Sequence, residues 1–390
     1  MWGIQTLGRI ERMGVGQKII EVLQRGIDDA VFPGAVALVT WRGKIVFFEH
    51  VGYRSLVPHR APMKRDTVFD LASLTKVMAT TPAIMKLVDE GRIALDDPLS
   101  ELIPHANLGD KKELTLRLLL THSAGLADWK PFYEKLRDHL LKERKRLLRE
   151  WIIEEPFAYQ PGKGSLYSDL GFMLLEWVIE ERTRETLPDF VQRNFYGPLG
   201  LKRTLFRGTS EEGNPPRPHF TKGGKMSTEE FAATEHCHWR KRVLQGEVHD
   251  DNAWTLGGYS GHAALFSTAE EIYVIANMLR EHYLGKRNDF FKPETVREFF
   301  RRQEIIKGSD WALGWDTRAL EGSSAGKYFS RDSVGHTGFT GTSIWMDLEK
   351  DVIAILLSNR VHPKRDNDKI KQFRPVFHDA VMEELGLSNA

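Results

Sequence analysis

Strand-forming sequence lies near both ends of this chain, with helix-forming sequence between. Residues 34–43 and 44–55 read GAVALVTWRG and KIVFFEHVGYRS, two runs rich in Val and Phe that indicate a hairpin. Near the other end, residues 341–360 read GTSIWMDLEKDVIAILLSNR, which indicates strand, turn and strand. Apolar residues at helical spacing precede the first hairpin, and residues 373–386 predict a closing helix. The chain therefore predicts one antiparallel sheet built from both ends and covered by the terminal helices.

Between these ends, from about residue 73 to residue 200, the apolar spacing is mainly helical. This order predicts an α/β sandwich into which a mostly helical lobe is inserted. We expect residues 1–72 and 255–390 to form the sandwich domain and residues 73–254 to form the inserted domain. Within the insert, residues 205–254 are rich in Gly, Pro, His and charge, so they predict a long irregular loop region. A ligand cleft between the two lobes is the default expectation.

The overall charge argues against a polyanionic partner. The 390 residues carry 55 Lys and Arg against 54 Asp and Glu, so no global field attracts nucleic acid or an anionic membrane. The single cysteine, Cys237, excludes an internal disulfide framework and a CxxC-type metal or redox site. Neither a signal-peptide pattern nor a run of about 18 apolar residues occurs. We expect a protein without a membrane span that is cytoplasmic, or periplasmic or extracellular if a leader has been removed; its oligomeric state is left open.

The stretch FDLASLTKVMATTPAIMKLVDEG, residues 69–91, places Ser73 and Lys76 three positions apart at the start of an apolar helix. Three residues are nearly one helical turn, so Lys76 projects beside the Ser73 hydroxyl. Burial and the positive end of the helix dipole both disfavour an ammonium, which lowers the pKa of such a lysine and lets it accept the serine proton. An N-terminal helix cap at Ser73 with an ordinary surface lysine is the structural alternative.

A second SxxK match, Ser324 to Lys327, lies in EGSSAGKYFS and also fits the GxSxG pattern of a nucleophile elbow. That motif needs a strand, a sharp turn and a helix. Here the glycine-rich stretch lies between short polar segments before a strand, so we expect a surface turn.

Two later motifs support the first match. FAYQPGKGSLYSDLGFML places Tyr167 in a Gly- and Pro-rich loop before a helix, where its phenol can share a proton with Lys76. DSVGHTGFTGTSIWMDL places His336, Thr337 and Gly338 at the start of a strand. The glycine lets a substrate backbone approach the strand, and the Phe339 N–H is expected to pair with that of Ser73 as an oxyanion hole.

With S-x-x-K, Y-x-[N/D] and [K/H]-T-G in this order, the chain resembles the penicillin-recognising serine hydrolases. Within them it is similar to the class C β-lactamase-like group of carboxypeptidases, esterases, D-aminopeptidases and amidases, over nearly its whole length. The resemblance implies Ser73 as the acylated nucleophile, Lys76 and Tyr167 as the acid/base pair, and residues 336–338 as a strand lining the site. It also implies an α/β sandwich with a helical lobe. FAATEHCHWRKRVLQGEVHDDNA resembles a subgroup associated with recycling of cell-wall amino sugars.

Two positions depart from dedicated β-lactamases, which have Asn and Lys where this chain has Asp169 and His336. A carboxylate only accepts hydrogen bonds, so Asp169 argues against penicillin-like substrates bound in the usual way. It also favours the ammonium form of Lys76, against the effect of burial, and shifts the role of base towards Tyr167. His336 carries a partial charge near neutrality, so it anchors a substrate carboxylate weakly and makes activity change between about pH 6 and 7.

Several other polar residues have structural interpretations. His249, Asp250, Asp251 and His262 cluster in EVHDDNAWTLGGYSGH, but their spacing matches no specific metal site, so we expect them to brace a loop or line the substrate site. His122 is interpreted as a structural histidine. We expect no metal and no cofactor.

The leading hypothesis is a serine hydrolase that forms an acyl-enzyme at Ser73. Its substrate is an amide or ester, such as a peptidoglycan-derived peptide, a D-Ala peptide or a small ester, and the substrate-binding residues are Asp169, His336, Thr337, Gly338 and Phe339. A different class stays open: a non-hydrolytic penicillin-binding or sensor-type protein of the same fold.

Overall fold

The computed structural model describes residues 16–209, 218–219 and 226–388. Its main sheet has seven strands in the order β10-β11-β12-β13-β1-β2-β3, and every neighbouring pair is antiparallel. The strands are β1 (Gly34–Trp41), β2 (Lys44–Ser55), β3 (Ala61–Pro62), β10 (Asp316–Thr317), β11 (Val334–Thr337), β12 (Ser343–Asp347) and β13 (Val352–Ser358). The first and last long strands, β1 and β13, lie side by side at its centre.

The predicted N-terminal hairpin forms between β1 and β2. Arg42 and Gly43 connect the two strands with φ of 53° and 76°, the positive angles that a two-residue hairpin turn requires. Seven of the eight residues of β1 and all seven of β13 are buried, because both faces of the sheet are covered. This explains why these strands read as continuous apolar runs rather than as alternating patterns.

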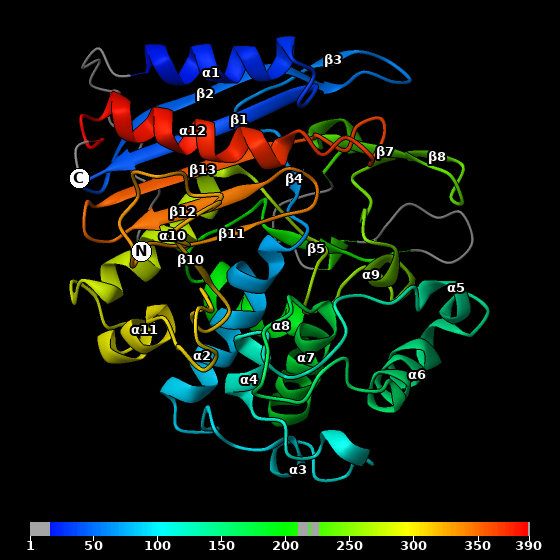
Figure 1. The fold of residues 1–390 in the computed structure, drawn as a ribbon. Helices are drawn as coiled ribbons and strands as arrows, with labels where there is room; N and C mark the ends of the chain where they lie inside the picture. Colours follow the sequence, from blue (N-terminus) through cyan, green and yellow to red (C-terminus); the bar gives the residue numbers. More distant parts are fainter. Residues whose placement is uncertain (1–15, 210–217, 220–225, 389–390) are drawn as a thin grey trace.

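Helices cover the main sheet on both faces (Figure 1). On one face α1 (Gln17–Asp28) and α12 (Ile370–Glu384) lie side by side, and a hydrophobic core joins them to β1, β2 and β13. On the other face α10 (Ala269–Tyr283) packs against β13 and β1, and α11 (Pro293–Phe300) packs against α10. The sheet is thus the middle layer of a sandwich.

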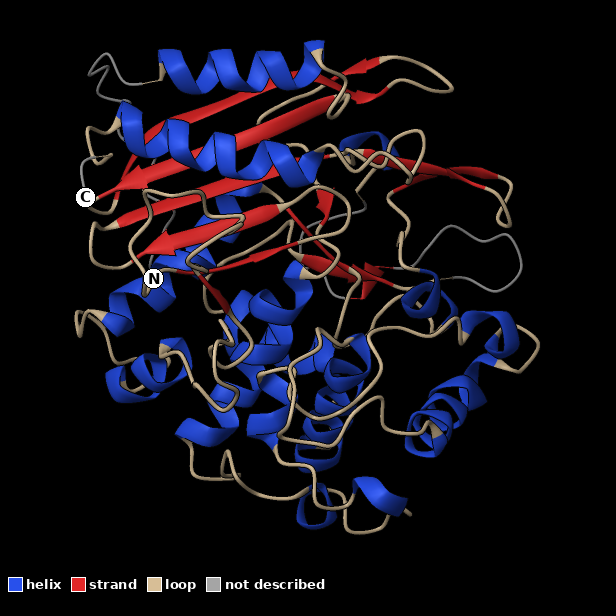
Figure 2. Cartoon of the chain, in the orientation of Figure 1, coloured by secondary structure: helices blue, strands red, loops and turns tan. Residues whose placement is uncertain are grey.

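A mostly helical lobe lies beside the sandwich, and Figure 2 shows it nearly free of strands. Its helices are α2 (Thr81–Asp89), α3 (Leu99–Leu102), α4 (Leu116–Leu120), α5 (Tyr133–Leu136), α6 (Leu141–Glu154), α7 (Asp169–Thr183) and α8 (Leu187–Val191), with π-helical turns at Lys76–Thr80 and Gln192–Tyr196 and a 3₁₀ turn at Gly109–Lys111. Helix α7 is buried on most sides, which makes it the centre of the lobe. The mixed architecture confirms the predicted α/β fold.

The long loop region is more ordered than predicted. A second sheet, β4-β9-β5-β6, joins β4 (Phe69–Asp70) and β9 (Leu265–Ser267) to β5 (Leu205–Arg207) and β6 (Pro218–His219). A hairpin of β7 (Ala233–Cys237) and β8 (Arg242–Gln245), a 3₁₀ turn at Thr228–Glu230 and helix α9 (Asp251–Thr255) follow. The sequence did not predict these strands because strands of two to five residues are too short to show a periodicity. Residues 210–217 and 220–225 of that region lie outside the described residues.

Within the part of the chain that the structure describes, no helix is both long enough and apolar enough to cross a bilayer.

Candidate active site

Ser73 follows the short strand β4 and begins the helix of its motif. The residue before it, Ala72, has φ of +46°, a conformation that a non-glycine residue adopts at a cost of about 1–3 kcal/mol. The buried Asp70 carboxylate stabilises this turn, since Oδ1 accepts the Ala72 N–H at 2.8 Å and Oδ2 accepts the His249 N–H at 2.7 Å. A left-handed residue held in this way presents Ser73 to the space between the two lobes.

Lys76 is fully buried and its ammonium has three acceptors. Nζ lies 3.0 Å from Ser73 Oγ, 2.7 Å from Asp169 Oδ1 and 3.0 Å from the His262 carbonyl oxygen. The backbone from Lys76 to Thr80 forms a π-helical turn, a deviation that frequently occurs at functional sites. The alternative of a surface lysine is therefore wrong for this position.

Two opposing effects act on the charge of Lys76, and the carboxylate prevails. Burial lowers the pKa of Lys76, but Asp169 and then Tyr167 outweigh burial and raise it above its ordinary value. The expected lowering by burial and the helix dipole is thus wrong, whereas the expected effect of Asp169 in favour of the ammonium form is found, and Lys76 rests as an ammonium that donates to Ser73. Asp169 is the first residue of α7 and lies 93 positions from Lys76 in sequence, so the fold brings this carboxylate to the lysine.

Tyr167 is held in place by His122. The His122 carbonyl accepts the Leu166 N–H at 2.9 Å, its Nδ1 accepts the Ser168 N–H at 3.0 Å, and its ring lies 4.6 Å from the Tyr167 ring. Burial raises the pKa of Tyr167, while Lys76 and a hydrogen bond with Ser73 oppose that effect. The phenol is neutral at rest and contacts both motif residues, and His122 acts as its structural support.

Trp311 lies against the other side of this aromatic cluster. Its ring stacks on that of Tyr167 with centroids 5.9 Å apart and meets the His122 ring edge-on at 4.3 Å. Nothing in the sequence around Trp311 marks it as a site residue.

His336 lies in β11 with a side chain only 3% exposed. Its Nδ1 lies 2.9 Å from the Thr337 carbonyl oxygen, and because a carbonyl only accepts, Nδ1 carries the proton. Nε2 therefore presents a lone pair, and no described group donates to it. Burial and then Lys76 lower the pKa of His336 to about 3. The expected partial charge near neutrality, with activity changing through about pH 6 to 7 because of His336, is wrong.

Gly338 begins a turn that is bonded to the backbone just before Ser73. A Cβ at Gly338 would lie 2.5 Å from the Leu71 oxygen and 2.1 Å from Thr342 Oγ1, so only glycine fits. Thr342 Oγ1 donates to the backbone carbonyl oxygen of Leu71 at 3.1 Å, and Thr340 Oγ1 donates to the backbone carbonyl oxygen of Asp70 at 2.7 Å. These contacts hold the turn against the segment that carries the serine.

The N–H groups of Ser73 and Phe339 have no hydrogen-bond acceptor among the described residues. Both residues line the same cleft, of about 790 Å³. The predicted residues that line it are Ser73, Tyr167, Asp169, His336, Thr337, Gly338 and Phe339, and Lys76 lies directly behind Ser73. All eight predicted site residues are thus brought together.

The cleft also contains charged residues that the sequence did not single out. Asp128 and Asp316 contribute carboxylates, whereas Arg360 and Arg374 contribute guanidinium groups, and Asp250 of the predicted polar cluster lines the cleft with them. Burial and the nearby Asp310 raise the pKa of Asp316 to about 7. The cleft therefore has a titrating group near neutrality, but it is this carboxyl and not His336.

Asp169, Asp250 and His262 place potential metal-ligand atoms within 4.8 Å of one another. These atoms are already engaged: Asp169 accepts from Lys76, and His262 bonds Asp250 at 3.0 Å and Ser260 Oγ at 2.9 Å. Burial lowers the pKa of His262, but Asp250 and Asp169 outweigh it and raise the pKa. Each of the three residues is thus held by hydrogen bonds within the protein.

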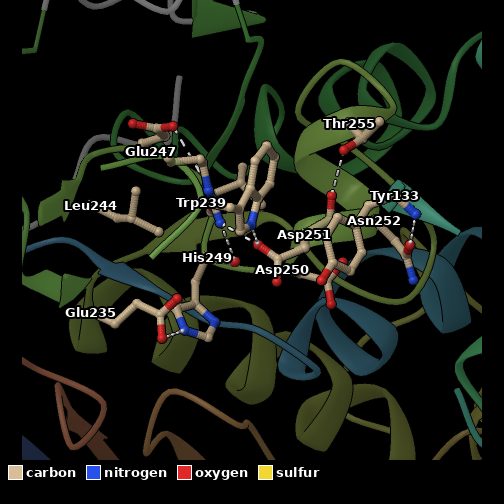
Figure 3. Close-up of polar contacts among 12 residues, drawn as sticks. Tyr133, Glu235, Trp239, Leu244, Glu247, His249, Asp250, Asp251, Asn252 and Thr255 are labelled. Carbon is tan, nitrogen blue, oxygen red and sulfur yellow. Dashed lines mark hydrogen bonds and ion pairs between the residues drawn. The ribbon is translucent and has the colours of Figure 1, made fainter. Parts of the chain in front are cut away.

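The neighbouring residues brace the loop between β8 and α9 (Figure 3). The Asp251 carboxylate accepts from the Trp239 indole N–H at 3.0 Å and from Arg240 at 2.7 Å. Asp250 accepts the Ala253 N–H at the start of α9, and Asn252 accepts the Tyr133 N–H from the helical lobe. Cys237 is buried in β7, outside the cleft.

Comparison with known proteins gives a family match. The family model described as Beta-lactamase matches residues 19–375. A Salmonella agona (strain SL483) protein named "Putative D-alanyl-D-alanine carboxypeptidase" is 33% identical over 363 residues, which cover 88% of this chain and 82% of that one.

Two solved structures share the fold. The D-amino acid amidase from Ochrobactrum anthropi SV3 has a TM-score of 0.69 at 20% identity and covers 95% of this chain and 98% of its own. An octameric penicillin-binding protein homologue from Pyrococcus abyssi also has a TM-score of 0.69 at 20% identity, and it covers 95% of this chain and 77% of its own.

Proposed function

Because the chain belongs to the beta-lactamase family of serine hydrolases, we propose that it hydrolyses an amide or ester through an acyl-enzyme at Ser73. One observation carries this assignment: Lys76 Nζ lies 3.0 Å from Ser73 Oγ while it is fully buried and paired with Asp169 at 2.7 Å. Removing the ammonium of Lys76 from water costs free energy that its ion pair with Asp169 need not repay in stability. Such an arrangement is therefore better explained by a role in catalysis than by a role in stability.

The resting charges suggest a path for the serine proton. Lys76 is an ammonium, so it takes the Ser73 proton only as it releases one of its own, and Asp169 is the acceptor within reach. As the Ser73 oxygen bonds to the substrate carbonyl carbon, its proton moves to Lys76 and a Lys76 proton moves to Asp169. The neutral Tyr167 phenol then donates to the leaving group and regains a proton from the Lys76 and Asp169 pair.

The oxyanion that forms in this step needs donors. The N–H groups of Ser73 and Phe339 have no acceptor among the described residues and both residues line one cleft, which supports their role as an oxyanion hole.

The substrate class follows from His336. A neutral imidazole with a free Nε2 lone pair accepts a hydrogen bond and does not anchor a carboxylate. Because that atom is enclosed by protein, we expect the substrate to be held by other groups of the cleft and not by a carboxylate at His336, as a short D-amino-acid amide or ester would be. Carboxylates at Asp128 and Asp250 line the same cleft, which suits a peptide that carries a positive charge.

The test combines a fluorophosphonate probe with a substrate panel. Wild-type protein should be labelled at Ser73, and Ser73→Ala should not be labelled. A panel of a muramoyl peptide, a D-Ala-D-Ala peptide, nitrocefin and short esters, followed by mass spectrometry, should show turnover of a peptide or ester and little of nitrocefin. Equal labelling of the two proteins contradicts the assignment of Ser73.

A binding or sensor protein of the same fold is the other candidate. It would be acylated at Ser73 and would not release the acyl group. A stable adduct formed with one equivalent of the ester's alcohol therefore favours it. Steady turnover favours the hydrolase.

A further inference from the structure

We propose that Arg374 is a positioning residue for the oxyanion hole: its guanidinium holds the Gly338 carbonyl and thereby directs and polarises the Phe339 N–H. The inference rests on the proposed acyl-enzyme function and identifies a group, 36 positions beyond Gly338 in sequence, on which that function depends.

The contact is short and buried. Arg374 extends from α12, and its Nη2 donates to the Gly338 oxygen at 2.6 Å and to the Thr342 oxygen at 2.9 Å. The side chain is only 7% exposed and it borders the cleft. It therefore grips both ends of the turn that carries Phe339.

Peptide geometry converts this grip into an effect on the N–H. The Gly338 carbonyl and the Phe339 N–H belong to one planar trans peptide and point in opposite directions. The Gly338 oxygen also accepts the Gly341 N–H at 3.1 Å, which places Phe339 at the second position of a turn, where the N–H is free. A cation bonded to the carbonyl draws electron density from the peptide and strengthens its N–H as a donor.

The charge of Arg374 is not neutralised by a carboxylate. Among the described residues, no Asp or Glu forms an ion pair with Arg374, whereas the nearby Arg365 pairs with Glu235 and Asp251. Burial and the neighbouring Arg360 lower the pKa of Arg374 to about 9, so it stays a cation at neutral pH. Its field therefore acts on the carbonyls that it contacts, rather than being cancelled locally.

Arg360 offers a matched control because it holds the next carbonyl along the turn. Its Nε donates to the Phe339 oxygen at 2.7 Å, it is 5% exposed, and no described carboxylate pairs with it. The peptide that it contacts carries the Thr340 N–H instead of the Phe339 N–H. Loss of Arg360 removes a buried cation from the same turn without releasing the Gly338 to Phe339 peptide.

The experiment compares Arg374→Met, Arg374→Lys and Arg360→Met with wild type, after circular dichroism has shown that each is folded. A p-nitrophenyl ester supplies kcat and KM, and an arylboronic acid, which forms a tetrahedral adduct with a reactive serine, supplies Kd. Arg374→Met should lose about 30- to 100-fold in kcat with KM changed less than about threefold, and boronate affinity should fall by a similar factor. Arg374→Lys should recover part of both, and Arg360→Met should lose less than about fivefold in each.

Equal losses in Arg374→Met and Arg360→Met, or a loss in kcat without one in boronate affinity, would overturn the inference. If Arg374→Met does not fold, Arg374→Lys decides: kcat and boronate affinity must fall together by at least about threefold, because a lysine makes one carbonyl contact well and not two. Failure of the proposed function looks different, since wild type would then bind no boronate at Ser73 and show no labelling by a fluorophosphonate.

Discussion

The chain contains the same four-residue pattern twice, and the two copies occupy opposite environments. Lys76 is fully buried, is bonded to Ser73 and is paired with Asp169. Lys327 is exposed over the ring of Tyr328, and Ser324 accepts the Trp345 indole N–H at 3.1 Å on the α12 side of the sheet. Spacing alone is thus uninformative. A buried lysine with a counter-charge from another element is what separates a candidate nucleophile from a turn.

The largest difference should appear when each of the two serines is replaced by alanine. Ser73→Ala removes the acylated oxygen, so kcat/KM on a p-nitrophenyl ester should fall by about 10⁵-fold or more. Ser324→Ala should stay within about twofold, with a small loss of thermal stability from the unpaired indole N–H. The comparison between the two patterns breaks if the losses are of similar size.

Next come the two lysines. Lys76→Met keeps much of the side-chain volume but removes the proton relay, so we expect a loss of about 10³- to 10⁴-fold in kcat. It also leaves Asp169 without its cation, so the protein should melt at a lower temperature. Lys327→Met should match wild type in steady-state kinetics and in melting temperature. An active Lys76→Met would assign the base to Tyr167 alone.

Asp169→Asn tests whether the carboxylate of Asp169 keeps Lys76 protonated. Without the carboxylate, burial is the dominant influence and the pKa of Lys76 falls. Lys76 then acts as a base only when it is neutral, so kcat/KM should rise with pH over the range where wild type is flat. We expect a loss of about 10- to 100-fold at pH 6 that narrows by pH 9. If the ratio of the variant's kcat/KM to that of wild type stays constant between pH 6 and pH 9, proton transfer from Lys76 to Asp169 is contradicted.

The smallest effect concerns pH. Asp316 loses its proton near pH 7 and borders the cleft, so the KM of a cationic peptide should fall severalfold as pH rises through 7. Asp316→Asn should remove that inflection, whereas His336→Asn should leave it in place because His336 protonates only near pH 3. An inflection that disappears in His336→Asn instead would reverse this assignment. Ser324→Ala should leave the pH dependence of KM unchanged.

Much of this arrangement could be predicted from the sequence, and the remainder depends on distant contacts. The terminal strands and the motif helix follow from local apolar patterns, so the sheet and the order of the motifs could be inferred. The charge of His336 could not, because it depends on burial within the fold, and for Lys76 the sequence named the opposing effects of burial and Asp169 without deciding which prevails. Asp70 and Arg374 belong to no motif: Asp70 supports the turn before Ser73, and Arg374 extends from α12 to the turn that carries Phe339.

The short strands were missed for the same reason. Strand β5 pairs with β9 across about sixty positions, and neither is longer than three residues. Such strands owe their conformation to the partner rather than to their own residues, so their sequences resemble loops.

The pairing of β1 with β13 also has a consequence for biosynthesis. Ala35 pairs with Ser358, so β1 waits for a partner that lies more than 300 positions later in the chain. The turn that carries Phe339, and the helix that holds it, are translated equally late. A nascent chain that has already exposed Ser73 therefore lacks a complete site, and chains truncated before β13 should be inactive and prone to aggregate through the unpaired edge of β1.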